Sequence, residues 1–145
     1  MNLLDTEITD ESFLLGLIPQ RPPFVMIDRL IHYSEKRIIS GFTIPKGNIL
    51  ATESHFSAAG LIENMAQTIA LHTGYKYYLA NKPAPTGYIG AIKSAEVLAI
   101  PEVDQELTTT IEIIHDIMNV TLVEAQVTCQ GQLIAQSQMK TALAS

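Results

Sequence analysis

Glu63 is the residue whose setting most favours chemistry, because the spacing of its neighbours places it at the border of an apolar helical stripe. At ~100° per residue, the Glu63 side chain falls beside Ala59, Ala66 and Ala70. Apolar surroundings disfavour the charged form of a carboxyl group, so we expect a half-buried acid that can donate a proton near neutral pH. A solvated carboxylate near the positive end of the helix dipole is the alternative, and the spacing leaves both open.

Two further residues could complete this chemistry. Gln67 stands one helical turn after Glu63 and is expected to hydrogen-bond its carboxyl group. His55 lies just before the helix, where the helix dipole favours a neutral imidazole that can act as a base. From spacing alone, an ordinary loop or capping role is the simpler interpretation of His55.

Other candidate side chains have structural interpretations. His72 falls within the apolar stripe of the same helix and is expected to be a hydrogen-bonded core residue. Met26 and Met65 are interpreted as core fillers, although flexible thioethers also suit the wall of an acyl-chain tunnel. Cys129 is the only cysteine, which excludes an intramolecular disulfide, and we expect it to be buried on a strand.

The composition and the missing motifs exclude several classes of protein. There is no Gly-rich phosphate loop, no His-Glu-x-x-His, no Cys-x-x-Cys and no Gly-x-Ser-x-Gly, so we expect neither a metal nor a nucleotide cofactor. The net charge of -6 argues against binding nucleic acid through its phosphates. The apolar runs are too short to cross a membrane. The acidic start argues against a secretory signal, and the lone cysteine fits a reducing compartment, so we expect a cytoplasmic protein.

One long helix and six strands are expected to position these residues. The apolar periodicity predicts the helix from Ser57, its N-cap, to about Ala80. Runs rich in β-branched and aromatic residues, separated by Pro, Gly and Asn, predict strands over residues 24–33, 37–44, 88–98, 106–117, 119–129 and 132–143.

This order of elements predicts an α+β fold, an antiparallel β-sheet wrapped around one long central helix. The chain has 145 residues, of which 47% are hydrophobic, so residues 1–145 are expected to form a single domain with an acidic N-terminal segment over residues 1–17. Such a sheet commonly needs a partner at an edge strand, and we therefore expect a dimer.

Several short motifs follow one another along the chain. Residues 19–29 read PQRPPFVMIDR, Phe56 follows His55, residues 61–67 read LIENMAQ, residues 88–93 read YIGAIK and residues 100–105 read IPEVDQ. They resemble, in order, the PHRxPFLLVDR, HFP, IIEAMAQ, FVGxxK and PGD motifs of the 3-hydroxyacyl-acyl-carrier-protein dehydratases. The segment between His55 and Glu63 is shorter here than in that family, and Ala58 stands where the family has glycine. Shortened relatives occur among the dehydratase-like proteins of aryl polyene and similar pigment pathways.

The resemblance implies a hot-dog fold and a dimer with a tunnel between its protomers. It also implies a His and Glu pair contributed across the dimer interface. On this mapping His55 takes the α-proton of the substrate, Glu63 protonates the departing hydroxyl group, and a backbone amide near Ala58 stabilises the enolate-like oxygen. The residues expected to contact the substrate are Ala58, Ala59, Gln67 and Gly90.

The substrate implied by the resemblance is an acyl chain joined as a thioester to the phosphopantetheine of acyl carrier protein. The expected function is dehydration of 3-hydroxyacyl thioesters to trans-2-enoyl thioesters in fatty acid or polyketide biosynthesis. The expected assembly is a homodimer, or a heterodimer with another dehydratase-type subunit. Two alternatives stay open. One is a non-catalytic acyl-binding partner of an active dehydratase, and the other is an acyl thioesterase in which Glu63 activates water without His55.

Overall fold

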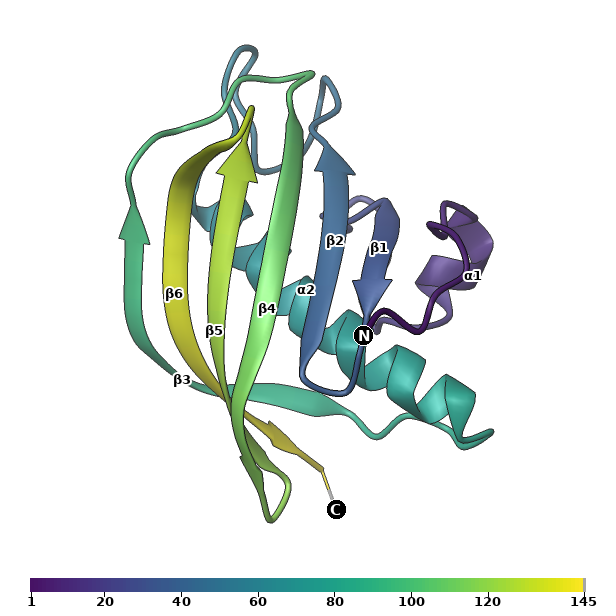
Figure 1. The fold of residues 1–145 in the computed structure, drawn as a ribbon. Coiled ribbons are helices and arrows are strands. Elements are labelled where there is room, and N and C mark those ends of the chain that lie inside the picture. Colours follow the sequence, from purple (N-terminus) through teal and green to yellow (C-terminus); the bar gives the residue numbers. More distant parts are fainter. Residues whose placement is uncertain (145) are drawn as a thin grey trace.

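The computed structural model describes residues 1–144 and contains one long helix held against one sheet. The helices are α1 (Glu11–Leu15) and α2 (Ala58–Leu79), and the strands are β1 (Arg29–Tyr33), β2 (Arg37–Thr43), β3 (Gly87–Val97), β4 (Glu106–Ile117), β5 (Val120–Cys129) and β6 (Gln132–Leu143). All strand pairs are antiparallel, in the order β1-β2-β4-β5-β6-β3. The sheet curves around α2 (Figure 1), which confirms the predicted fold class.

Helix α2 forms where the periodicity predicts it and is buried on more than one face. Ser57 is its N-cap, and the Ser57 side chain accepts a hydrogen bond from the Gly60 amide at 3.0 Å. The predicted core residues Met65 and Met26 are buried, as is Cys129. Besides apolar residues, the buried positions of α2 carry the polar side chains of Asn64, Gln67, Thr68 and His72. Buried polar side chains of this kind need hydrogen-bond partners, and the Thr68 hydroxyl group finds one of its partners in the Asn64 carbonyl of the same helix.

The predicted strand over residues 24–33 is shorter in the structure, where β1 begins only at Arg29. We call residues 24–28 the strap. Its backbone forms hydrogen bonds with side chains of α2 as well as with the neighbouring strand β2. The backbone amide of Met26 donates to Gln67 Oε1 at 2.6 Å, and Asn64 Nδ2 donates to the Met26 carbonyl at 2.7 Å. The prediction was wrong here because an apolar, β-branched run does not reveal which groups its backbone bonds.

The two edges of the sheet differ. The N-terminal segment lies along β1, where the Leu3 amide donates to the Tyr33 carbonyl at 2.7 Å and Ile8 bridges to Leu30. At the other edge lies β3 (Figure 1), of which ten consecutive residues are exposed within the described chain. Its exposed residues include the large apolar side chains of Tyr88, Ile89 and Ile92. A long apolar edge strand of this kind is a template for pairing with another chain.

His72 is a buried core residue, as predicted. Its side chain is 6% exposed, its Nε2 atom lies 2.9 Å from the Ser34 carbonyl oxygen, and its ring packs on Tyr33 with the centroids 4.9 Å apart. Burial lowers the pKa of the His72 imidazole below its ordinary value, although the hydrogen bond to Ser34 opposes this shift. The folded protein therefore holds His72 neutral under conditions in which an exposed imidazole takes up a proton.

We expect His72 to make the fold less stable in mildly acidic solution. Because the pKa of His72 is lowered in the folded state, below about pH 6.5 the unfolded chain binds a proton at this residue more readily than the folded chain does. The free energy of unfolding therefore decreases as the pH decreases. Urea unfolding from about pH 8 to about pH 5 measures this slope. The slope should be shallower in His72→Gln, whose amide can still bond Ser34.

His32→Gln is the matched control. Burial also lowers the pKa of His32, but its ring is far less buried than that of His72, so the slope should change less. An unchanged slope in His72→Gln would show that another group causes the acid sensitivity.

Candidate active site

The carboxyl group of Glu63 is half-buried on α2 and is held by the residue one turn further on. Gln67 Nε2 donates to Glu63 Oε1 at 2.8 Å, so the predicted hydrogen bond is present. The same Nε2 donates to the Phe24 carbonyl at 2.7 Å, while Gln67 Oε1 accepts from the Met26 amide at 2.6 Å. The strap therefore fixes the Gln67 amide and leaves one of its N–H groups for the carboxyl group.

A cavity of about 420 Å³ begins one turn beyond Glu63. Ala66 is the first residue of α2 to line it, and Ala70 and Gly74 continue that wall along the helix. Tyr88 and Ile89 of β3 also line the cavity, so it lies beside the open edge of the sheet. Its volume falls within the range of about 300–1,000 Å³ that is typical of small-molecule sites. Glu63 itself does not line this cavity, and Ala66 is the lining residue of α2 that comes first after it.

His55 lies in the exposed loop before α2, and this loop is held in place on both sides. The His55 amide donates to Thr52 Oγ1 at 3.0 Å, and its backbone bridges to Glu102 in the connection between β3 and β4. The His55 Nδ1 atom lies 2.8 Å from Ser54 Oγ, which leaves Nε2 as the ring nitrogen outside this bond.

Within residues 1–144 no hydrogen bond joins His55 to Glu63. The side chain of His55 bonds next to the helix start, whereas that of Glu63 bonds one turn further along the helix, at Gln67. The structure thus joins Glu63 and Gln67 by a hydrogen bond, whereas the His55 side chain bonds to Ser54 instead.

The start of α2 carries the two alanines predicted to contact substrate. Ser57 Oγ accepts from the Gly60 amide, and the Ser57 carbonyl accepts from the Leu61 amide at 3.1 Å. Ala58 and Ala59 are the first two residues of α2, and both are exposed. The backbone amides of a first helical turn have no acceptor within the helix, so these two amides are donors at its terminus. Backbone amides at a helix start can stabilise a developing oxyanion.

Gly90 is on the exposed edge strand β3, one residue after Ile89 of the cavity wall. A Cβ atom at Gly90 would meet only the Lys140 carbonyl oxygen, at an ordinary 3.5 Å. The position therefore does not require glycine within the single chain.

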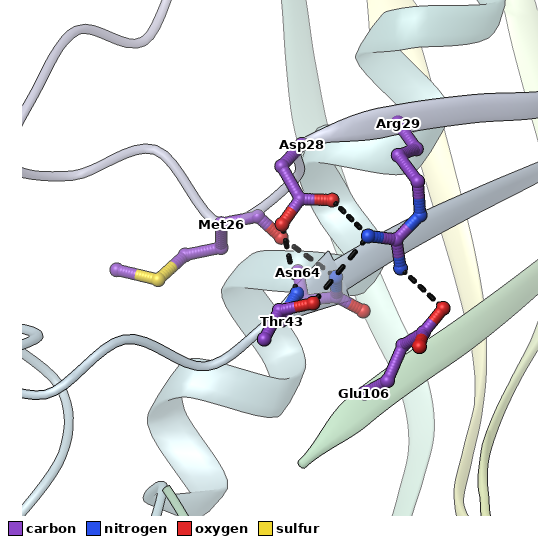
Figure 2. A network of polar contacts seen from close by, with 6 residues as sticks. All are labelled: Met26, Asp28, Arg29, Thr43, Asn64 and Glu106. Atoms are coloured by element: carbon purple, nitrogen blue, oxygen red, sulfur yellow. Dashed lines mark hydrogen bonds and ion pairs between the residues drawn. The ribbon is translucent and has the colours of Figure 1, made fainter. Parts of the chain in front are cut away.

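Sequence reasoning missed a set of ionic contacts that fastens the end of the strap. Asp28 Oδ2 accepts from the Thr43 amide at 2.8 Å, and Asp28 Oδ1 pairs with Arg29 Nη1 at 2.9 Å (Figure 2). Arg29 Nη2 reaches Glu106 on β4 at 2.8 Å. Burial raises the pKa of the Asp28 carboxyl group above its usual value, and the Thr43 amide and the Arg29 guanidinium oppose that shift. The only sequence signal for this anchor is the Asp-Arg pair itself.

Two general features bear on the class of site. Within residues 1–144, no three His, Cys, Asp or Glu side chains are grouped so that they could hold a metal ion. In the same range, neither helix combines the length and the apolar character that crossing a bilayer requires.

Comparison with protein families gives the affiliation of the chain. The model of the ApeP-like family, described as ApeP dehydratase, matches residues 14–144. The chain belongs to the ApeP-like dehydratase family. This confirms the dehydratase resemblance of its motifs. A comparison with curated protein sequences finds no match.

Solved structures share the fold of this ApeP-like chain. The dehydratase heterocomplex ApeI:P from Xenorhabdus doucetiae matches with a TM-score of 0.82 and 15% identity, covering 91% of each chain. The uncharacterized protein PH1136 from Pyrococcus horikoshii matches with a TM-score of 0.69 and 11% identity over 90% of this chain and 92% of that one. A hypothetical thioesterase from Streptococcus pneumoniae, solved with coenzyme A, gives 0.64 and 13% over 80% and 84%. These matches confirm the hot-dog fold.

Proposed function

We propose that this chain is a dehydratase subunit that converts 3-hydroxyacyl thioesters on acyl carrier protein to trans-2-enoyl thioesters in the cytoplasm. The observation that carries the proposal is the Glu63 carboxyl group, oriented by Gln67 one turn before a cavity that suits an apolar chain. Membership of a dehydratase family supports the reaction class. The pathway would be fatty acid or polyketide biosynthesis.

The reaction requires a base and an acid on the two carbons that become the double bond. His55 takes the proton from the α-carbon, and the C–H electron pair forms the new double bond as the β-hydroxyl group departs. Glu63 gives that hydroxyl group a proton, so it leaves as water. The negative charge that develops on the thioester oxygen is stabilised by an amide near Ala58. Proton exchange with solvent then restores both side chains.

A second subunit at β3 would complete this site. His55 and Glu63 do not bond within one chain, so we propose that each site combines His55 of one protomer with Glu63 of the other. The exposed apolar residues of β3 suit edge-to-edge pairing, and Tyr88 and Ile89 place the cavity beside that edge. The partner is a second copy or another dehydratase-type subunit. The ApeI:P heterocomplex of Xenorhabdus doucetiae is a precedent for the latter.

Product analysis tests the proposal directly. The purified chain is incubated with a 3-hydroxyacyl carrier-protein thioester, and the products are followed by mass spectrometry and by a free-thiol assay. We expect the acyl group to lose the mass of water without release of thiol.

The same experiment separates the two alternatives. Thiol release would favour a thioesterase in which Glu63 activates water, a function supported by the fold match to a hypothetical thioesterase. Binding without turnover would favour a non-catalytic partner if activity appears on addition of another hot-dog subunit and is kept when this chain carries Glu63→Gln or His55→Ala.

The wall of the cavity predicts how acyl-chain length is selected. Leucine at position 70 would place its additional carbon atoms inside the cavity that Ala70 lines, so Ala70→Leu should exclude the end of a long acyl chain. We expect kcat/KM for long acyl chains to fall about fourfold for each methylene group displaced, while short chains are unaffected. A series of thioesters of increasing length measures this.

Ala80→Leu is the control, because Ala80 is exposed at the end of α2 and does not line the cavity. An equal loss for short and long chains in Ala70→Leu would contradict the assignment of the cavity to the acyl chain.

A further inference from the structure

We propose that Asn64 is a positioning residue for Glu63, acting through the strap and Gln67. Its effect on turnover rests on the proposed dehydratase function, whereas its effect on the Gln67 side chain does not. Asn64 neighbours Glu63 in the sequence, but its side chain is fully buried and contacts the strap and the sheet.

The amide of Asn64 joins three parts of the fold. Asn64 Nδ2 donates to the Met26 carbonyl at 2.7 Å (Figure 2), and Asn64 Oδ1 accepts from Thr109 Oγ1 of β4 at 2.6 Å. Burying an amide is unfavourable unless both of its ends are hydrogen-bonded, and both ends of Asn64 are. A leucine would fill a similar volume without this requirement, so the asparagine contributes a fixed relation between strap, helix and sheet.

Met26 transmits this relation to Gln67. Its two backbone groups both bond to α2, the carbonyl to Asn64 and the amide to Gln67 Oε1 at 2.6 Å. The planar Gln67 amide has two N–H bonds, directed at the Phe24 carbonyl and at Glu63 Oε1. Because the strap fixes two of these three contacts, a shift of Met26 would rotate the amide and redirect the N–H group away from Glu63.

The far end of the strap is fixed independently. Asp28 is held by the Thr43 amide and by Arg29, which pairs in turn with Glu106 of β4 (Figure 2). Among the side-chain hydrogen bonds of residues 1–144, only those of Gln67 and Asn64 join α2 to the strap. The bond from Asn64 to Met26 is therefore the one that does not involve Gln67. Its loss should move the strap next to Gln67 while the end at Asp28 stays anchored.

Thr68 provides a matched control on the same helix. It is as buried as Thr109, and its hydroxyl group bonds to the Asn64 backbone carbonyl at 2.8 Å and to Ser40 Oγ at 2.7 Å. Neither bond leads to the strap. Thr68→Val and Thr109→Val thus remove the same buried group, but only the second disturbs the path to Glu63.

The test compares Asn64→Leu, Thr109→Val and Thr68→Val with the wild type. Turnover of a 3-hydroxyacyl thioester gives kcat and KM, thermal melting gives Tm, and ¹H–¹⁵N spectra report the side-chain amide of Gln67. We expect Asn64→Leu to lose about 10- to 100-fold in kcat with little change in KM, and to shift the Gln67 amide resonances. Thr109→Val should show smaller changes in the same direction. Thr68→Val should lower Tm but keep kcat and the Gln67 resonances.

Several results would overturn the proposal. Unshifted Gln67 resonances or a wild-type kcat in folded Asn64→Leu would do so, as would equal losses of kcat in Thr68→Val and Thr109→Val. If Asn64→Leu does not fold, Thr109→Val carries the test. If the wild type turns over no 3-hydroxyacyl thioester, the proposed function fails, yet the Gln67 resonances still support or refute the positioning role.

Discussion

Glu63→Gln is expected to lower kcat for enoyl thioester formation by about 100- to 10,000-fold, the range that a positioned general acid contributes. The glutamine side chain fits the same space, and its carbonyl oxygen can accept the hydrogen bond from Gln67 Nε2, so the fold should keep its stability. It cannot, however, give a proton to the departing hydroxyl group. Single-turnover assays with a 3-hydroxyacyl carrier-protein thioester measure the chemical step, and thermal melting monitors folding.

Glu53→Gln is the control for the loss of one acidic side chain close to α2. Glu53 is exposed in the loop before the helix, so its substitution should leave kcat unchanged. Wild-type turnover by Glu63→Gln would remove Glu63 from the chemistry.

Ile92→Arg is expected to prevent pairing at the β3 edge and to abolish activity with it. Ile92 is 46% exposed on β3, so replacing it with arginine should change the free energy of unfolding of the isolated chain only slightly. At a paired edge, the same guanidinium group would lose solvent without gaining a partner, which is strongly unfavourable. Sedimentation at several protein concentrations should show a dimer for the wild type and a monomer for the variant. Activity should disappear with the dimer if each site is built from both protomers, as proposed.

Leu3→Arg is the control at the opposite edge of the sheet, where Leu3 is 55% exposed and its backbone bonds to Tyr33. It should leave the dimer intact. A wild-type chain that sediments as a monomer would require a different subunit at β3, and an Ile92→Arg dimer would exclude this edge as the interface.

The parts of the fold that local chemistry dictates were predictable from the sequence. Helix α2 follows from its apolar periodicity and the Ser57 cap. The limits of β4 and β6 matched those predicted, because turn residues separate the strands. Asn119 and Gly131 adopt positive φ angles of 66° and 76° in these two turns, a conformation that asparagine and glycine favour. The bond between Gln67 and Glu63 was predictable because it spans one helical turn.

The parts that depend on distant partners were not predictable. The strap resembles a strand in composition, but its backbone partners Asn64 and Gln67 lie 38 and 41 residues further along the chain from Met26. The role of Asn64 was not predictable because its hydrogen-bond partners are Met26 and Thr109, and Thr109 is 45 residues away in the sequence. The pairing that we propose between His55 and Glu63 would involve two chains, and a single sequence carries no signal for a contact of that kind.

Mixing two inactive variants tests the shared site most directly. His55→Ala and Glu63→Gln protomers, carrying different tags, are unfolded, combined and refolded, and the doubly tagged dimers are purified. If His55 and Glu63 come from different protomers, each hybrid dimer contains one intact site, and activity returns to about half that of the wild-type dimer. Purified hybrid dimers that stay as inactive as their parents would contradict a site built across two chains.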